Sequence, residues 1–125
     1  MAGIPAALSA IRTALYTELP PAAAQAVFTG GVDGRDPFGV IRDRTGNLYG
    51  TAEFGGTANL GVVFSLDLAG SETVLHSFTG GLDGAYPRAG VIRDSAGRLY
   101  GTTQVGGRKG YGGVLFEIHP ASPKE

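Results

Sequence analysis

The chain has 125 residues, enough for one domain, and a net charge of −1 from 10 basic and 11 acidic residues. These charges are mixed along the chain, whereas phosphate binding needs clustered Lys and Arg, so we expect no nucleic-acid partner. The lack of cysteine removes disulfides, thiolate zinc sites and cysteine nucleophiles. No apolar run approaches the roughly 18 residues of a membrane-spanning helix.

The first 25 residues form a separate N-terminal segment. Residues 5–19 are predicted to be a short helix, because Pro5 suits a first turn and apolar residues recur at helical spacing. We expect this helix to cover an exposed sheet end, since its single Arg12 is no basic stripe of the kind a membrane-surface helix carries. The segment superficially resembles a signal peptide but lacks a basic beginning, so it leaves the compartment open.

From residue 26 onward the sequence contains an internal repeat that covers most of the chain. Phe28 returns as Phe78, Tyr49 returns as Tyr100, and the offset grows from 50 to 51 between these pairs. A repeat of about 50 residues indicates a modular architecture. The chain therefore divides into four parts: a helix and connector at 1–25, a first repeat at 26–78, a second and incomplete repeat at 79–119, and a tail at 120–125.

Short strands separated by turn residues are predicted in both repeats. The predicted strands are 38–43, 48–53, 61–67 and 73–78 in the first repeat and 89–94, 99–104 and 113–118 in the second. Residues 26–28 form the stub of a further strand, and Gly46 is expected to supply a positive φ in the first turn. A β-propeller blade is a four-stranded antiparallel sheet. The predicted fold is therefore all-β, with two four-stranded antiparallel β-propeller-like blades after a short N-terminal helix.

Both faces of each predicted sheet carry apolar side chains. Alternate residues of a strand face opposite sides, so Val62 and Phe64 share one face and Val63 lies on the other. This pattern is expected of sheets that stack on neighbouring sheets. Gly50 and Gly101 lie in mid-strand, where glycine weakens a sheet, so we expect another backbone to approach closely there.

Several sequence segments recur in fixed order in the two repeats. The most specific are TGG (79–81), DG (83–84), LYGTT (99–103) and GVVF (61–64). Together they resemble the GloVer repeat, a tandem module of bacterial choice-of-anchor proteins, over roughly residues 26–118. The D-x-x-G-N-L-Y stretch that begins at Asp43 is also similar to NHL-type propeller repeats. The resemblance implies a propeller-like array, often on exported or surface-attached proteins, and no established catalytic site; it thus points to an extracellular or cell-surface location.

Two repeats are too few for a closed propeller, which has four to eight blades. An open array leaves unpaired strand edges that favour association. The stub at 26–28 corresponds to the strand that the second repeat lacks, so three chains placed head to tail would form a six-bladed ring. The alternative is a fragment of a larger propeller protein, folded as a two-sheet stack.

The acidic loops and the histidines are weak candidates for metal ligands. Asp33 and Asp83 recur in T-G-G-x-D-G loops, where an aspartate that bonds its own turn is favoured over a calcium site needing six to eight oxygens. His76 and His119 occupy non-equivalent positions, and a metal needs several converging ligands. We expect no metal and no cofactor.

Arginines and tyrosines also recur at matching positions. Arg42 and Arg93 each precede an aspartate at a strand end, where an ion pair or hydrogen bond between repeats is favoured over an anion-binding channel. Tyr49 and Tyr100 lie in mid-strand, and Tyr111 joins a loop of the second repeat. Such tyrosines usually fill the space between sheets. If they instead face a cleft beside Arg or Asp, they would stack on a sugar ring.

Three functions follow from these observations. The first is a non-enzymatic repeat module for protein interaction or scaffolding, self-associating through open blade edges. The second is a carbohydrate-binding lectin with sites between blades and a glycan as partner. The third, a remnant of a propeller enzyme, would require repeated His or Glu ligands that the two repeats do not provide, so no enzymatic activity is expected.

Overall fold

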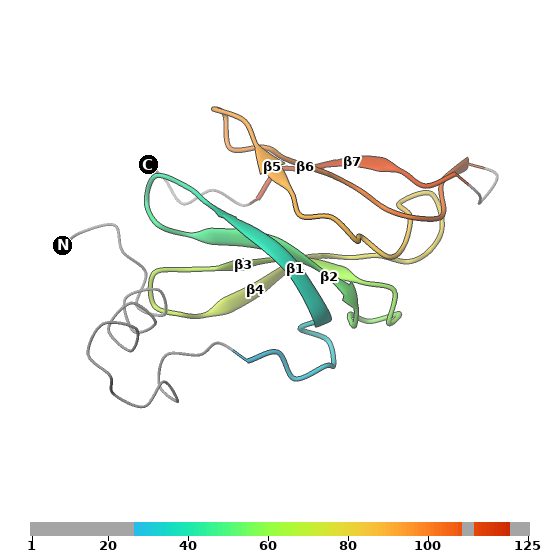
Figure 1. The fold of residues 1–125 in the computed structure, drawn as a ribbon, viewed down its shortest axis with the longest axis horizontal. Helices are drawn as coiled ribbons and strands as arrows, with labels where there is room; N and C mark the ends of the chain where they lie inside the picture. Colours follow the sequence, from blue (N-terminus) through green and yellow to red (C-terminus); the bar gives the residue numbers. More distant parts are fainter. Residues whose placement is uncertain (1–26, 109–111, 121–125) are drawn as a thin grey trace.

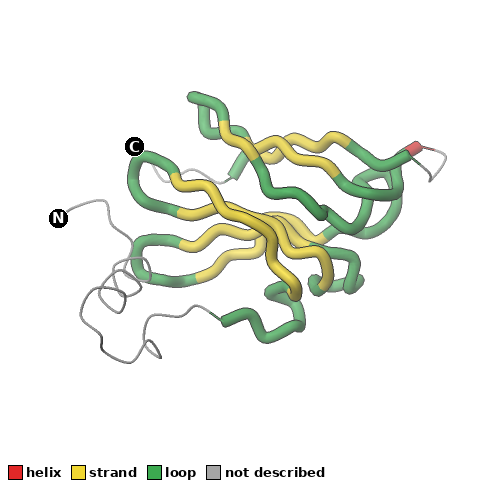
Figure 2. The backbone as a smooth tube through the Cα atoms, viewed as in Figure 1, coloured by secondary structure: helices red, strands yellow, loops and turns green. Residues whose placement is uncertain are grey.

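The computed structural model describes residues 27–108 and 112–120, which form two antiparallel sheets (Figures 1 and 2). The first sheet contains β1 (Arg35–Arg42), β2 (Leu48–Phe54), β3 (Val62–Leu66) and β4 (Glu72–Ser77), paired in chain order. The second contains β5 (Ile92–Arg93), β6 (Leu99–Thr102) and β7 (Leu115–Ile118), also in chain order. The all-β prediction is confirmed for the described residues, but the second sheet has three strands where two four-stranded sheets were predicted. The described sheets do not close into a ring.

One type of turn closes three of the hairpins. Asp43, Asp67 and Asp94 start the turns between β1 and β2, β3 and β4, and β5 and β6. In each turn the aspartate Oδ1 accepts hydrogen bonds from the backbone N–H groups two and four residues later, at 2.9–3.0 Å. The glycine three residues after the aspartate has a positive φ, which is 98° at Gly46, so that prediction is confirmed.

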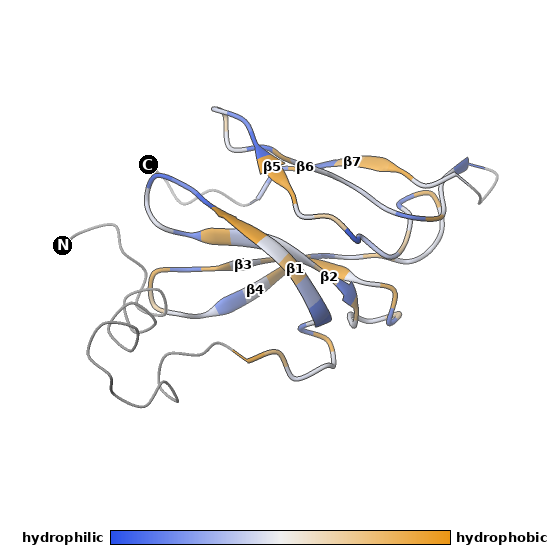
Figure 3. Ribbon diagram, in the orientation of Figure 1, coloured by the Kyte–Doolittle hydropathy of each residue, from blue (hydrophilic) through white to orange (hydrophobic). Residues whose placement is uncertain are grey.

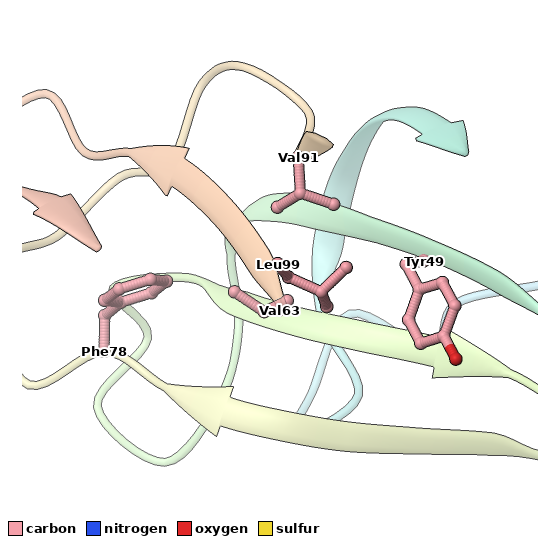
Figure 4. Packing of buried hydrophobic residues seen from close by; sticks show 5 residues of the cluster. All are labelled: Tyr49, Val63, Phe78, Val91 and Leu99. Atoms are coloured by element: carbon pink, nitrogen blue, oxygen red, sulfur yellow. The ribbon is translucent and has the colours of Figure 1, made fainter. Parts of the chain in front are cut away.

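The two sheets stack through unlike faces, and their shared core lies between them (Figure 4). Tyr49 and Val63 of the first sheet pack in one buried cluster with Leu99 of the second. Polar contacts also cross the gap: the Thr51 hydroxyl donates to the carbonyl oxygen of Ala89 at 2.8 Å. Removing the Leu99 side chain from water contributes about 1.5–3 kcal/mol. The sheets are thus held by a continuous core.

The other face of the first sheet carries a second cluster. Phe64 is buried there, and Phe28 packs edge-on against it with ring centroids 4.8 Å apart. The equivalent pair in the second repeat, Phe78 and Phe116, lies 5.2 Å apart in the shared core. The hydropathy colouring shows apolar segments on strands of both sheets (Figure 3). The expectation of apolar side chains on both faces is confirmed for the first sheet.

The strand before the third turn is shorter than predicted. Residues 89–94 were expected to form it, but β5 contains only Ile92 and Arg93. Arg88 is one extra residue compared with the first repeat, where β1 continues through the equivalent proline, Pro37. The chain before β5 is instead fixed by an isolated bridge between Ala85 and Val105. This bridge is the equivalent of the Arg35–Phe54 pair of the first sheet, so the inserted residue interrupts the ladder between the bridge and β5.

Two predictions concern the N-terminal part of the chain, the strand stub at 26–28 and the helix at 5–19. Residues 27 and 28 are outside any strand, so the predicted stub is not formed by the residues that are described there. The predicted helix at 5–19 lies outside the described residues. Within 27–108 and 112–120, no helix is long and apolar enough to cross a bilayer.

The two mid-strand glycines, Gly50 and Gly101, leave space for the phenyl ring of a phenylalanine on the neighbouring strand. A Cβ placed on Gly101 would lie 2.5 Å from Cζ of Phe116, on the neighbouring strand. A Cβ on Gly50 would lie 2.8 Å from Cζ of Phe64 and 2.9 Å from the carbonyl oxygen of Gly39. The expectation of an approaching backbone is thus wrong for Gly101, where an aromatic side chain occupies the space.

Candidate functional site

A polar cleft lies between the two sheets, where the β1–β2 turn faces the β5–β6 turn. It consists of two adjoining hollows of about 350 and 370 Å³, which share Asp43, Arg93 and Ser95. We call it the inter-sheet cleft. Its remaining lining comes from the same two turns and from the end of β7: Arg44, Thr45, Asn47, Tyr49, Ala96, Gly97, Arg98, His119 and Pro120.

Asp43 is the most heavily bonded group in this cleft. Its carboxylate accepts hydrogen bonds from the backbone and side chains of Thr45 and Asn47 at 2.9–3.2 Å. The buried Tyr49 hydroxyl donates to its Oδ2 at 2.9 Å. Burial alone would raise the pKa of Asp43, but these hydrogen bonds together outweigh it and lower the pKa below its usual value. Burial and the Asp43 carboxylate raise the pKa of Tyr49 to about 12.

The second repeat builds the same constellation in a more exposed position. The Tyr100 hydroxyl donates to Asp94 Oδ2 at 3.0 Å, and Arg98 Nε donates to the same oxygen at 2.7 Å. Desolvation opposes ionisation of Asp94, but the hydrogen bonds from Arg98 and Tyr100 lower its pKa to about 2. Both aspartates are therefore ionised, with their oxygens engaged inside their own turns, which leaves neither suited to act as a base. Each of these two aspartates bonds the backbone of its own turn.

Arg93 lies where the two hollows of the cleft meet. Its Nε is buried and has no hydrogen-bond partner among the described residues. Arg44 and Ser95 line the same region. A guanidinium with an unused donor beside hydroxyl groups can bind carboxylate or hydroxyl oxygens. Arg42, the equivalent of Arg93, is exposed at the end of β1 and does not line the cleft, so these hollows do not join the two arginines in one channel.

Each sheet also has an apolar face that no described residue of the other sheet covers. The outer face of the second sheet carries Ile92, Tyr100, Thr102 and Leu115, with one charged residue, Glu117, opposite Tyr100. Leu115 is 75% exposed, whereas its first-repeat equivalent, Val63, is 0% exposed because the second sheet covers it.

The outer face of the first sheet shows the reverse difference. Val40 is 52% exposed there, whereas its second-repeat equivalent, Val91, is 3% exposed. A largely apolar hollow of about 370 Å³ lies on this face, and Glu72 is at its edge. Its other lining residues are Val27, Phe28, Pro37, Phe38, Val40, Leu48, Phe64, Leu66 and Gly70. At each of these two pairs of equivalent positions, the residue of one repeat is buried and the residue of the other repeat is exposed.

The sequence pattern of the Gloeobacter/Verrucomicrobia repeat matches residues 16–124. The chain belongs to this family. The resemblance to the GloVer repeat is thereby confirmed over most of the chain. No curated protein and no solved structure gives a significant match.

The T-G-G-x-D-G loops of this GloVer chain have a structural role. Asp33 accepts hydrogen bonds from the backbone N–H of Thr29 at 2.8 Å and from its hydroxyl, and Asp83 does the same with Thr79. These hydrogen bonds lower the pKa of Asp33. Both aspartates thus bond their own loop, as predicted. Within the described ranges, no three His, Asp or Glu side chains gather as a metal site.

Each loop is also fixed by a close backbone approach that only glycine allows. A Cβ on Gly55, where φ is 89°, would lie 2.5 Å from the Cα of Gly34. A Cβ on Gly106, where φ is 95°, would lie equally close to the Cα of Gly84. Gly55 and Gly106 therefore let the T-G-G-x-D-G loop of each repeat pack closely against the end of the following strand segment.

The three tyrosines proposed as sugar platforms differ in access. Tyr49 is 7% exposed and lies in the shared core, so its ring offers no open surface (Figure 4). Tyr100 is half-exposed on the outer face of the second sheet. Tyr111 lies outside the described residues.

Sequence reasoning missed several groups that the structure brings forward. Arg44 and Ser95 line the inter-sheet cleft, and their place after the repeated aspartates could have indicated it. The Nε2–H of His76 donates to the Asp83 carboxylate at 2.8 Å, a pairing absent from the first repeat's sequence. Glu72 has a buried Oε2 without a hydrogen-bond partner in the described part of the chain. Its repeat equivalent falls at residue 22, so repetition gave no signal for it.

Proposed function

We propose that this chain is a non-enzymatic, β-propeller-type repeat module that acts by stacking its sheets on further sheets, as an interaction or scaffolding unit. The observation that carries this proposal is the unequal burial of equivalent positions. Val63 is covered by a neighbouring sheet and Leu115 is open, although both occupy the same place in the repeat. A surface built to be covered in one copy is suited to be covered in the other.

Energetics support the same conclusion. Burial of apolar surface contributes roughly 25 cal/mol per Å², so covering an exposed leucine and isoleucine on one sheet contributes about 3–6 kcal/mol before ordering costs. In repeat proteins, stability is approximately a sum of repeat terms and nearest-neighbour interface terms. A further sheet that stacks on an open face therefore increases the stability of the array.

A single-chain extension tests this proposal without assuming the partner's identity. The sequence of residues 68–119 is appended directly after His119, which is equivalent to Asp67, so that the second sheet gains a fourth strand and a further sheet follows it. The free energy of unfolding is then measured by urea denaturation. A stacking module gives one cooperative transition with greater stability than the parent chain. Two separate transitions, with the parent's midpoint unchanged, would refute stacking.

The inter-sheet cleft supports a second candidate function, carbohydrate binding between blades. The specific observation is a hollow of about 350 Å³ in which Arg93, Ser95 and Asn47 offer polar atoms to a small hydroxylated ligand. Binding would be measured on a glycan array and then by calorimetry. Arg93→Ala should abolish binding, and Arg42→Ala, at the equivalent position outside the cleft, should preserve it. Equal loss in both variants would refute this assignment.

A further inference from the structure

We infer that the partner of each open face is a second copy of this chain, with the outer face of the second sheet stacked on the outer face of the first sheet of the next copy. This inference rests on the proposed stacking function and specifies its partner. The two open faces are unlike, so the contact is head to tail rather than between two identical patches.

The contact between the two sheets of one chain is the template for this contact. On one side of the internal interface lie Ile41, Tyr49, Thr51 and Val63, and their second-repeat equivalents lie on the outer face of the second sheet, beside Glu117, which pairs with Tyr100. Leu75 of β4 also packs at the internal interface, and the three-stranded second sheet has no equivalent of it. On the other side lie Val91, Leu99, Phe116 and Ile118. Their first-repeat equivalents, all on the outer face of the first sheet, are Val40, Leu48, Phe64 and Leu66. Each open face is thus a repeat copy of one half of an interface that the chain already forms.

Side-chain sizes are preserved well enough for the same packing. Val63 is replaced by Leu115, Leu99 by Leu48, and Tyr49 by Tyr100. Every one of these replacements keeps an apolar or aromatic side chain of similar volume. The hollow on the first sheet's outer face gives space for the slightly larger Leu115. Packing complementarity of this kind is what an interface core requires.

Charges at the edge of the two faces are complementary as well. In the internal interface the Arg93 guanidinium lines the same hollow as Asp43, and its positive charge opposes the rise in the pKa of Tyr49. The equivalent groups in a contact between copies are Arg42 of one chain and Asp94 of the next. Arg42 is exposed, and Asp94 is ionised with its pKa held at about 2. Opposite charges at matching places favour head-to-tail stacking and fix its register.

The outcome of repeating this contact is a ring or an open stack. A heterologous contact closes when the rotation between copies divides a full turn and otherwise continues as a filament. Propellers have four to eight blades, so two to four copies of this two-sheet unit would close. Three copies give a six-sheet ring, the assembly predicted from the correspondence between the strand stub at 26–28 and the strand that the second repeat lacks.

The first experiment measures the molar mass of the full chain by light scattering after size exclusion, over about 1–100 μM. We expect a closed or growing assembly for the wild type. Leu115→Glu and Val40→Glu each bury a carboxylate in the contact, so each should weaken association by more than about a hundredfold. Leu82→Glu is the matched control, because Leu82 is 74% exposed and lies in a loop outside both faces. It should leave the mass unchanged, with circular dichroism confirming that all variants fold.

A mixing experiment tests the direction of stacking. Leu115→Glu retains an intact first-sheet face and Val40→Glu an intact second-sheet face, so an equimolar mixture should form a 1:1 dimer that neither variant forms alone. Should Val40→Glu not fold, Phe38→Glu on the same face takes its place. A mixture that stays monomeric while the wild type assembles overturns head-to-tail stacking. A wild type that stays monomeric throughout overturns the second copy as partner, whereas the single-chain extension separately decides whether the repeat stacks at all.

Discussion

Replacing Tyr49 by phenylalanine tests whether the repeated Asp–Tyr pair stabilises the stack of sheets. The hydroxyl of Tyr49 donates to Asp43 Oδ2 at 2.9 Å, and the two residues are 7% and 9% exposed. Asp43 lines the inter-sheet cleft but is largely buried, so water can replace the lost donor only in part. A hydrogen bond to a charged group contributes about 1.5–3 kcal/mol. Because Thr45 and Asn47 still bond the carboxylate, we expect a loss of about 2 kcal/mol, in the lower part of that range.

The matched control is Tyr100→Phe. Tyr100 donates to Asp94 at 3.0 Å in the same geometry, but this pair lies on the open face of the second sheet. Solvent can hydrate Asp94 when the hydroxyl is removed, so the control should lose distinctly less stability. The two substitutions remove the same atom from the same motif. The pairs differ in whether a neighbouring sheet covers them and in the side chains that also bond the carboxylate, Thr45 and Asn47 at Asp43 and Arg98 at Asp94.

Urea denaturation of the monomeric chain measures both variants. With a slope of about 1–2 kcal/mol per molar urea, the Tyr49→Phe midpoint should fall by about 1–2 M. Ultraviolet titration of the wild type should show one tyrosine ionising near pH 12, and Tyr49→Phe should remove that step. Equal losses in the two variants would show that the second sheet does not protect the first pair, which would refute the burial argument.

Three further predictions address the backbone, the charge and the core. Gly106→Ala should destabilise by at least about 2 kcal/mol, because φ is 95° and its Cβ meets a backbone atom, while Gly39→Ala, with open space around it, should be neutral in the same denaturation assay. Burial, and secondarily Asp33, raise the pKa of Glu72 to about 7 from 4.5, so the folded chain holds a proton that the unfolded chain releases, and stability falls as pH rises from about 4.5 to 7. Glu72→Gln should therefore stabilise at pH 8 and not at pH 4, and an equal gain at both would contradict this. Leu99→Ala should cost about 2–5 kcal/mol, and Leu48→Ala less, because only Leu99 is fully buried; a larger loss for Leu48 would contradict the stacking order.

Local patterns predicted the strands well where the repeat is intact. Alternating apolar residues and the Asp-x-x-Gly turns placed β2 at Leu48–Phe54, one residue longer than expected. The prediction was less accurate for β5, because the insertion of Arg88 breaks the register, and no local propensity reports how a loop then bonds across to Val105. Turn chemistry is local and therefore readable, whereas register depends on both strands.

The candidate site was predicted only in part. The recurrence of Asp, Arg and Tyr indicated the repeated motif, but it could not distinguish Tyr49 from Tyr100, which lie in matching R-D-x-x-G-x-L-Y-G-T stretches. Likewise, repetition could not show that Arg93 lines a cleft and that Arg42 does not. Equivalent positions of the two repeats carry similar residues, whether the sheet face they lie on is covered by the other sheet or open.

The sequence by itself determined the repeat, from matching segments about 50 residues apart. It also determined the all-β fold, the hairpin turns and the apolar residues on both faces of the first sheet, because these follow from residue spacing within about ten positions of the chain. Only the tertiary structure decided which copy of each face is covered, where the inter-sheet cleft opens and which hydrogen bonds are buried. Those properties depend on what lies on the other side of a sheet, and one sheet's sequence does not contain its neighbour.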